Sequence, residues 1–349
     1  MASLPGALRA PTAHRLLTAA HEGSREFLGV LDGASLLVVE LDPDDDLDVP
    51  VPPWLPAVVV AVADAPPSRP APAGVDIALC PTGAGAPPAG WVALADPAGE
   101  AARLGGTAAR FPQSAVVLAQ LLRTTLQGEE EQAFLAESLA YSTLQAGPAF
   151  AAWLAERRGA PQRERPEPEH AVVVERRDDR LLVTLHRPHV HNAVNGRMRE
   201  ELAEALMLAC ADHSVRAVEL RGEGPSFSSG GDLDEFGTLP DPATGHLVRM
   251  ARSPARLLAR MRSRTVVYVH GACVGAGIEL AAFAATVVAA PDTRVQLPEV
   301  PLGLVPGSGG TVSIPRRVGR HRAAWLAIGA ATIDAVTAAQ WGLVDRIED

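Results

Sequence analysis

Two glutamates in the second half of the chain stand in surroundings that favour acid–base chemistry. Glu279 follows the small residues GAG at the start of an apolar helix in HGACVGAGIELAAFAA, and Glu299 lies between two prolines in LPEVPLGLVPGSGGT. The prolines around Glu299 and the glycine-rich segment after it could hold this carboxylate rigidly near a small ligand. Each also has an ordinary interpretation: Glu279 as a helix cap or arginine partner, and Glu299 as a hydrated loop residue.

Two nearby segments offer backbone N–H groups for a developing oxyanion. Residues 227–236, FSSGGDLDEF, contain consecutive glycines, which let the backbone approach a ligand closely. The helix that begins near residue 275 has first-turn N–H groups without helical partners, at the positive end of its dipole. Such groups would stabilise a developing oxyanion. The alternative for residues 227–236 is a tight turn in which Asp232 caps a helix.

Composition removes several other chemistries. All 31 basic residues are arginine, which excludes a Schiff-base nucleophile, a P-loop lysine and a lysine general base. The sequence contains no GxSxG or HExxH motif, and its net charge of −10 disfavours nucleic-acid binding. Three widely spaced cysteines predict neither a disulfide framework nor a zinc site. We therefore expect no metal, no resident cofactor and no nucleic-acid partner.

The elements that must position these residues fall into two parts. Residues 159–170, GAPQRERPEPEH, combine prolines with charges and are typical of a linker between residues 1–158 and 171–349. In the first part we expect an additional N-terminal α/β domain of unknown role. Apolar runs predict strands at residues 36–41, 57–63, 75–80 and 91–95. Helical periodicity predicts helices at residues 113–126 and 129–157, and Gly147-Pro148 should break the second of them.

The second part alternates strands and helices with short connections, which predicts α/β layering. Two alternating runs at residues 171–176 and 181–186 predict a hairpin. Beyond it we expect helices at residues 196–211, 247–261 and 275–285, and strands at residues 217–221, 265–270 and 286–290.

The motifs of this second part resemble the crotonase, or enoyl-CoA hydratase/isomerase, superfamily over about residues 175–349. In order they are HRPHVHNAVN, FSSGGDL, GACVGAGIELA, LPEVPLGLVPGSGGT and AAQWGLVDRI. The resemblance implies an α/β, crotonase-like ββα spiral core that binds an acyl-CoA thioester and stabilises its enolate. Coenzyme A would arrive as part of the substrate and not as a resident cofactor.

The resemblance also implies roles for particular residues. The Gly231 and Ala276 N–H groups would form the oxyanion hole, although the family usually has glycine at the second position. Glu279 would activate or position a water for addition at the β-carbon, Glu299 would carry the proton at the α-carbon, and the Gly307 N–H would help to hold the water. Contacts with the substrate or with CoA are expected from Arg187, Asn192, Ser229 and Asp232.

Because both glutamates are present, the expected activity is enoyl-CoA hydration, the syn addition of water to a 2-enoyl-CoA. Double-bond isomerisation, cofactor-free dioxygenation of an aryl-acyl-CoA, and a non-catalytic acyl-CoA-binding or partner subunit stay open. Relatives usually continue through several helices past the GLV element, so we expect the first part, particularly residues 113–157, to act as a lid or to form oligomer contacts. A degenerate crotonase-like copy is the alternative. We expect a cytoplasmic homo-oligomer without a membrane partner, since no segment is long and apolar enough to span a bilayer.

Overall fold

The computed structural model describes residues 7–21, 29, 33–42, 45, 47–125, 128–157 and 167–348. Most of the expected linker, residues 159–166, lies outside the described residues. The expected α/β class is confirmed, because helices accompany three sheets in the described part. Within that part, no helix is long and apolar enough to cross a membrane.

A parallel five-stranded sheet forms the additional N-terminal α/β region, with its strands in sequence order. The strands are β1 (Leu8–Arg9), β2 (Leu36–Leu41), β3 (Val58–Ala63), β4 (Ile77–Pro81) and β5 (Trp91–Leu94). Strand β3, VVVAVA, is buried along its whole length, as expected for a strand covered on both faces. Helix α1 (Ala10–His21) lies against β2, whereas α2 (Pro97–Arg110) and α3 (Pro112–Thr124) pack on β3.

The second half contains a six-stranded and a three-stranded sheet. In the larger sheet only the β6–β7 hairpin is antiparallel, and its order is β14-β11-β9-β8-β7-β6. Its strands are β6 (Val172–Arg177), β7 (Arg180–Leu185), β8 (Ala217–Gly222), β9 (Thr265–Val269), β11 (Thr286–Ala289) and β14 (Arg346–Ile347). The smaller sheet consists of β10 (Ala272–Val274), β12 (Arg294–Gln296) and β13 (Thr332–Asp334).

The helices largely follow the expected pattern. The break at Gly147-Pro148 is confirmed, because α4 (Glu130–Gln145) ends there and α5 (Pro148–Arg157) begins. The single helix expected at residues 247–261 is wrong: it is two helices, because Ser253 caps the second and Pro254 occupies its first position. The helices of the second half are α6 (Gly196–Ala211), α7 (Pro242–Ala251), α8 (Pro254–Arg260), α9 (Ala276–Ala281), α10 (Gly310–Val318), α11 (Arg320–Ile328) and α12 (Ala335–Gln340).

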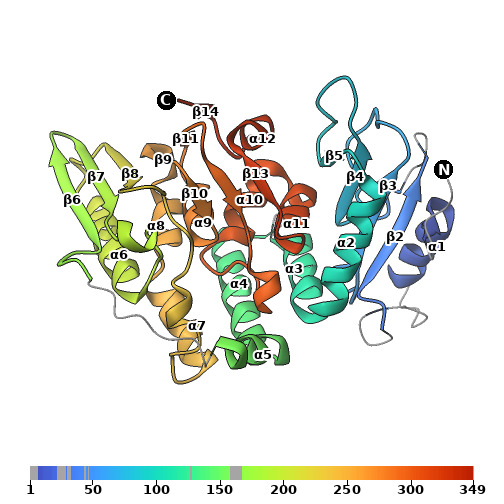
Figure 1. Ribbon diagram of the computed structural model, residues 1–349, viewed down its shortest axis with the longest axis horizontal. Helices are drawn as coiled ribbons and strands as arrows, with labels where there is room; N and C mark the ends of the chain where they lie inside the picture. The colour runs from blue at the N-terminus through green and yellow to red at the C-terminus, as the bar shows by residue number, and fades with distance from the viewer. Residues whose placement is uncertain are drawn as a thin grey trace.

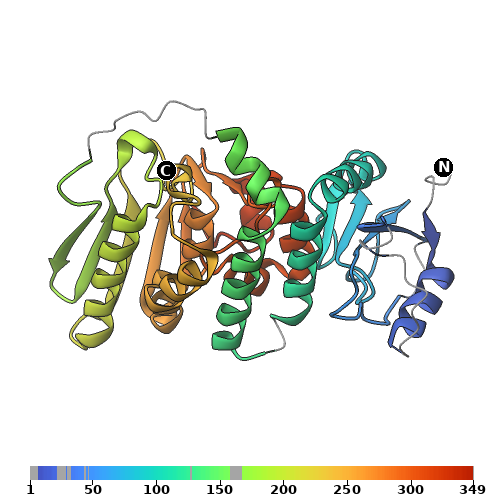
Figure 2. The same cartoon turned by 90° about the horizontal axis from the view of Figure 1, so that it is seen from below.

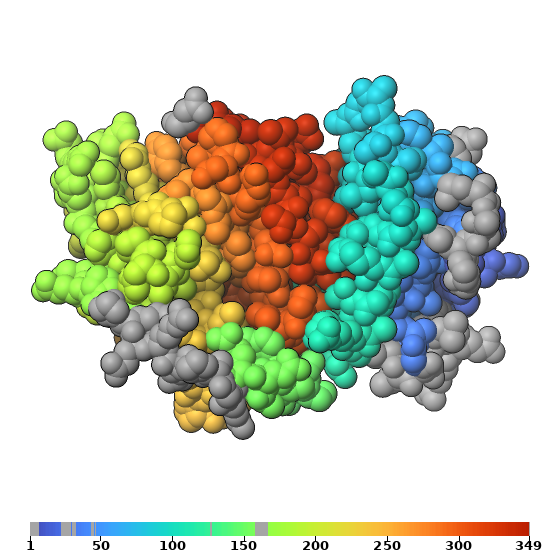
Figure 3. All heavy atoms as spheres, viewed as in Figure 1, coloured from blue at the N-terminus to red at the C-terminus, as the bar shows by residue number. Residues whose placement is uncertain are grey.

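The two halves share a hydrophobic core, and a second buried cluster belongs to the N-terminal half alone. Helix α4 packs against α7 and α10, and α11 packs against α3, so α3 and α4 lie in the middle of the elongated molecule, whereas α1 lies at one end (Figures 1 and 2). The rings of Phe134 in α4 and Phe283 after α9 lie 5.5 Å apart, and both belong to the same buried cluster. Figure 3 shows the atoms of α4 and α5 directly against those of the second half. This packing brings α4 to the expected catalytic loops.

Candidate active site

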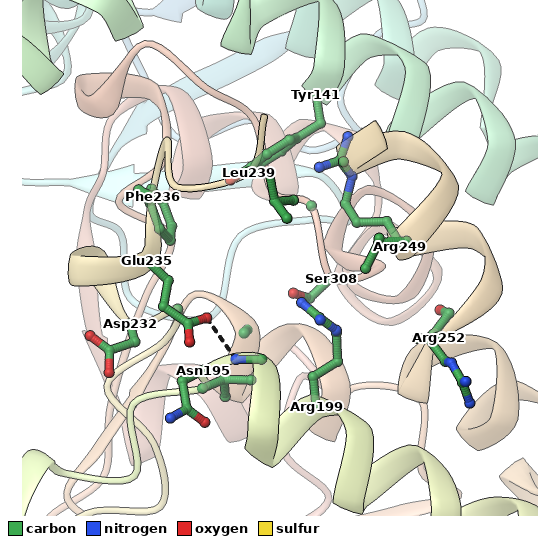
Figure 4. Close-up of a pocket in the computed structure, with 18 of the residues that line it drawn as sticks. Tyr141, Asn195, Arg199, Asp232, Glu235, Phe236, Leu239, Arg249, Arg252 and Ser308 are labelled. Carbon is green, nitrogen blue, oxygen red and sulfur yellow. Dashed lines mark hydrogen bonds between the residues drawn. The ribbon is translucent and has the colours of Figure 1, made fainter. Parts of the chain in front are cut away.

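A cavity of about 360 Å³ lies between α4, α6, α7, α9 and the turn that precedes α10. It brings together many of the residues singled out from the sequence, and Figure 4 shows its polar lining. Helix α4 of the N-terminal half also contributes to the wall. Of the expected site residues, the lining includes Gly231, Asp232, Ala276, Glu279, Glu299 and Gly307.

The two expected oxyanion segments are held side by side. Ser228 N–H donates to Ala272 O and Val274 N–H donates to Ser228 O, each at 3.0 Å, so the segments form a short parallel bridge. Gly230 has φ +94°, and a Cβ there would lie 3.0 Å from Val274 O, so this approach needs glycine.

Beyond this bridge, both expected donors reach the cavity. Gly231 and Ala276 line it, and neither N–H donates to another group in the part of the chain that the structure describes. Two unpaired N–H groups at one cavity wall are suited to bind an oxyanion.

Glu279 is buried in the first turn of α9, with 2% of its surface exposed. Its Oε2 accepts hydrogen bonds from Ser308 N–H at 2.7 Å and Gly310 N–H at 2.9 Å. Burial, followed by the charges of Glu299 and Glu137, raises the pKa of Glu279 well above its usual range, and the two N–H donors oppose that rise. The two donors stabilise the charged form, so they lower the cost of ionising this buried carboxyl group.

Glu299 precedes a short 3₁₀ turn (Val300–Leu302) and is 9% exposed. Its Oε2 is buried and has no hydrogen-bond partner among the described residues. The backbone of Gly275 leaves room for the other oxygen, because a Cβ at Gly275 would lie 2.6 Å from Glu299 Oε1. Burial raises the pKa of Glu299 to about 8, which keeps its proton in place at neutral pH. A protonated carboxyl group with one unpartnered oxygen at a cavity is suited to donate a proton.

A third buried carboxylate, Glu137, comes from α4. Its Oε1 accepts from Gly309 N–H at 2.7 Å, and its Oε2 accepts from the N–H and the hydroxyl of Thr311 at 2.9 and 2.7 Å. Burial raises the pKa of Glu137 to about 7, although these three hydrogen bonds oppose the rise. Sequence reasoning missed Glu137, whose available signal was an acid on the helix face that carries Phe134 and Tyr141.

Tyr141 and Arg249 form the wall of the cavity opposite α6. The Arg249 guanidinium lies 4.5 Å from the centre of the Tyr141 ring and donates to Ser138 and Gln145 of α4 (Figure 4). The Tyr141 ring covers Gly307, where a Cβ would lie 2.6 Å from the ring atom Cε2. Neither residue was expected from the sequence.

Three of the four residues expected to bind substrate or CoA lie outside the lining, as far as the described residues go. The Arg187 side chain is 2% exposed and forms ion pairs with Glu167 and, at 3.0 Å, with Asp232. Asn192 is fully buried and bonds to loop backbone, whereas Ser229 is exposed. A contact between Arg187 and a CoA phosphate would therefore require these ion pairs to open. Asp232 lines the cavity itself.

The part of the chain that the structure describes contains no cluster of three or more His, Cys, Asp or Glu side chains that could hold a metal ion. The three buried carboxylates instead bind backbone N–H groups or face the cavity. Their arrangement can transfer protons beside a pair of oxyanion donors.

An α/β fold with two buried glutamates beside free backbone N–H groups defines a class of acid–base site, and comparisons with known proteins give the family. The chain belongs to the enoyl-CoA hydratase/isomerase family, or crotonase superfamily, whose model matches residues 176–348. It is 34% identical to 2,3-dehydroadipyl-CoA hydratase of Escherichia coli (strain K12) over 179 residues, which cover 50% of this chain and 68% of that protein.

It is also 36% identical to a probable enoyl-CoA hydratase of Bacillus subtilis (strain 168) over 166 residues, 47% of this chain and 63% of that protein. A putative enoyl-CoA hydratase from Thermobifida fusca YX, solved in complex with CoA, is 34% identical with a TM-score of 0.47, and the match covers 54% of this chain and 77% of that chain. The chain thus spans about two thirds of the length of the curated relatives it matches.

Proposed function

We propose that the protein hydrates the double bond of a 2-enoyl-CoA by syn addition of water. The observation that carries this proposal is that Glu279 and Glu299, both buried, line one cavity with the free N–H groups of Gly231 and Ala276. Family membership and the hydratases among the relatives support the same reaction.

The thioester carbonyl oxygen accepts hydrogen bonds from the Gly231 and Ala276 N–H groups. Ionised Glu279 takes a proton from a water molecule while the water oxygen forms a bond to the β-carbon. The electron pair of the double bond moves into the enolate, whose oxygen the two N–H groups stabilise. Glu299 then delivers its proton to the α-carbon, so that one water has been added across the double bond.

The contacts of the two glutamates support this division of roles. Two N–H donors stabilise the charged form of Glu279, whereas Glu299 Oε2 has no donor among the described residues. In this scheme the proton shared by the pair starts on Glu299 and the negative charge on Glu279, where the two N–H donors stabilise it. Gly307 lines the same cavity, and in this scheme its N–H holds the water.

The phosphates of CoA must meet arginine or backbone, since the sequence has no lysine. Arg199 and Arg252 both line the cavity and share one carboxylate, Glu200, at 3.3 and 3.2 Å. Arg199 Nε is buried without a partner among the described residues, and its side chain points into the cavity (Figure 4). We assign these two arginines, ahead of Arg187, to an anionic group of the substrate.

The test is the hydration of crotonyl-CoA in deuterated water by the full chain and by Glu279→Gln and Glu299→Gln. We expect each variant to lose about 10²- to 10⁴-fold in turnover, with deuterium at the α-carbon of the wild-type product. Equal rates for wild type and Glu299→Gln would refute the assigned proton donor.

Other products would identify the alternative functions. A migrated double bond without added water would favour isomerisation, and oxygen consumption with an aryl-acyl-CoA would favour dioxygenation. Tight binding across a panel of acyl-CoA thioesters without turnover would favour a non-catalytic subunit. Each of these results would contradict the hydratase proposal.

A further inference from the structure

We infer that Glu137, supplied by the N-terminal half, is a positioning residue of the catalytic site: it fixes the turn that binds Glu279 and adds a third carboxylate to the pair. This inference deepens the proposed function, because it names what controls the two acid–base groups. It assigns α4 a part in the chemistry as well as in covering the cavity.

The turn before α10 shows the arrangement most clearly. Four successive N–H groups point at two carboxylates in alternation: Ser308 and Gly310 donate to Glu279, whereas Gly309 and Thr311 donate to Glu137. These groups belong to the start of α10, where no preceding helical carbonyl is available. The turn is therefore held from both sides, and the orientation of Glu279 depends on Glu137.

The contact is also specific to this position of α4. Glu137 is 3% exposed and its side chain also binds the Thr311 hydroxyl at 2.7 Å. Glu131, on the same helix, forms a 2.7 Å ion pair with Arg256, and its side chain is half exposed. Both glutamates join α4 to the second half, but only Glu137 reaches the catalytic turn. Glu131 is therefore a matched control for helix docking.

Titratable and charged groups of the neighbouring elements face Glu137. The negative charge of Glu137 raises the pKa values of Glu279 in α9 and of Glu299, whereas the positive charge of Arg249 in α7 lowers the pKa of Glu137; Tyr141 lies one turn further along α4. His246 of α7 contacts the adjacent Ser138 at 2.9 Å.

These neighbours set the pH range in which Glu137 acts. Its own pKa of about 7 means that it changes charge near neutral pH, and its negative charge raises the pKa values of Glu279 and Glu299. Loss of Glu137 should therefore let Glu299 give up its proton at a lower pH.

The experiment follows carboxyl carbons by NMR during a pH titration of the full chain labelled with δ-¹³C glutamate. In wild type we expect signals that still titrate above pH 6, and the Glu299 signal is identified by its loss in Glu299→Gln. In Glu137→Gln the midpoint of the Glu299 signal should fall by about one pH unit. In Glu131→Gln it should not move. An unchanged midpoint in Glu137→Gln would overturn the inference.

A milder variant covers the case in which Glu137→Gln does not fold. Thr311→Val removes one donor to Glu137 and keeps its carboxyl group in place, which raises the pKa of Glu137. The Glu299 midpoint should again fall, by less than in Glu137→Gln, and a midpoint equal to that of wild type would overturn the inference.

Kinetics give a second readout. If the full chain hydrates crotonyl-CoA, the alkaline limb of its pH profile should move to lower pH in Glu137→Gln and stay in place in Glu131→Gln. A Glu137 that served only folding would lower the amount of active protein without moving this limb. Since the NMR titration needs no turnover, a protein that lacks hydratase activity would refute the proposed function and leave the role of Glu137 to be decided by the titration.

Discussion

Replacement of Glu299 by glutamine should stabilise the protein at alkaline pH. In the folded protein, burial raises the pKa of Glu299 from 4.5 to about 8. The folded state therefore holds this proton more tightly than the unfolded chain does, so its contribution to stability is complete below about pH 4.5 and is lost as the pH rises to about 8. At ~1.4 kcal/mol for each pKa unit, the loss amounts to about 5 kcal/mol.

Glutamine has nearly the shape of the protonated carboxyl group and never becomes charged. The free energy of unfolding of Glu299→Gln should therefore lie within about 1 kcal/mol of the wild-type value at pH 5. At pH 9 it should exceed the wild-type value by up to about 5 kcal/mol. Urea unfolding at the two pH values measures the free energy of unfolding of both proteins.

The control for this comparison is Glu175→Gln. The hydrogen bond from Arg177 lowers the pKa of Glu175, which is exposed, so its charge does not change between pH 5 and 9. The difference in free energy of unfolding between Glu175→Gln and wild type should therefore be the same at both pH values. If Glu299→Gln also showed the same difference at pH 5 and pH 9, Glu299 would not be a buried, proton-holding carboxyl group, and its assignment as the acid would be wrong.

Three further changes probe the walls of the site and the packing of the halves. Gly307→Ala places a methyl group 2.6 Å from Tyr141 Cε2, so it should lower the free energy of unfolding in urea by about 1–3 kcal/mol. It should also lower kcat for crotonyl-CoA, and wild-type kinetics would contradict this packing. Gly106→Ala in the exposed part of α2, where the new Cβ meets no atom within 4 Å, should instead stabilise by about 0.5–1 kcal/mol with unchanged kinetics, and a loss of stability would be the contrary result. Deletion of residues 1–157 should give insoluble or inactive protein because the core is shared, as sedimentation and activity would show; a soluble, active remainder would disprove this.

Most helices and strands, and the two glutamates Glu279 and Glu299, could be predicted because the signals for them lie in short segments of the sequence. The apolar run at residues 58–63 has the length of a buried strand, and Gly147-Pro148 interrupts a helix because proline cannot continue its hydrogen bonds. Glu279 and Glu299 could be placed at one cavity because the motifs that carry them resemble a family with a known arrangement. The false single helix at residues 247–261 had the opposite cause: its apolar periodicity continues across Pro254, which starts a new helix.

Contacts between distant segments could not be predicted in the same way. Arg187 was expected to bind a phosphate because its neighbours in the sequence do not indicate that it forms ion pairs with Glu167 and Asp232. Glu137 looked like one of many helix acids, since its partners Gly309 and Thr311 lie in the other half of the chain. The role of a side chain can be predicted from the sequence when its partners are close to it in the sequence. It cannot be predicted in this way when the fold brings the partners from distant segments.

The position of α4 explains why a separate N-terminal part is bound so closely to a crotonase-like core. A buried carboxylate is costly, and three of them near one turn repel each other. The helix N-terminus offsets part of this cost by donating hydrogen bonds to Glu137 and Glu279, and the positive charge of Arg249 offsets a further, smaller part. The remainder must come from packing, which the shared core provides through Phe134 and its neighbours. The same helix therefore brings the third carboxylate and the apolar surface that stabilises it, so the site and the docking of the two halves depend on one another.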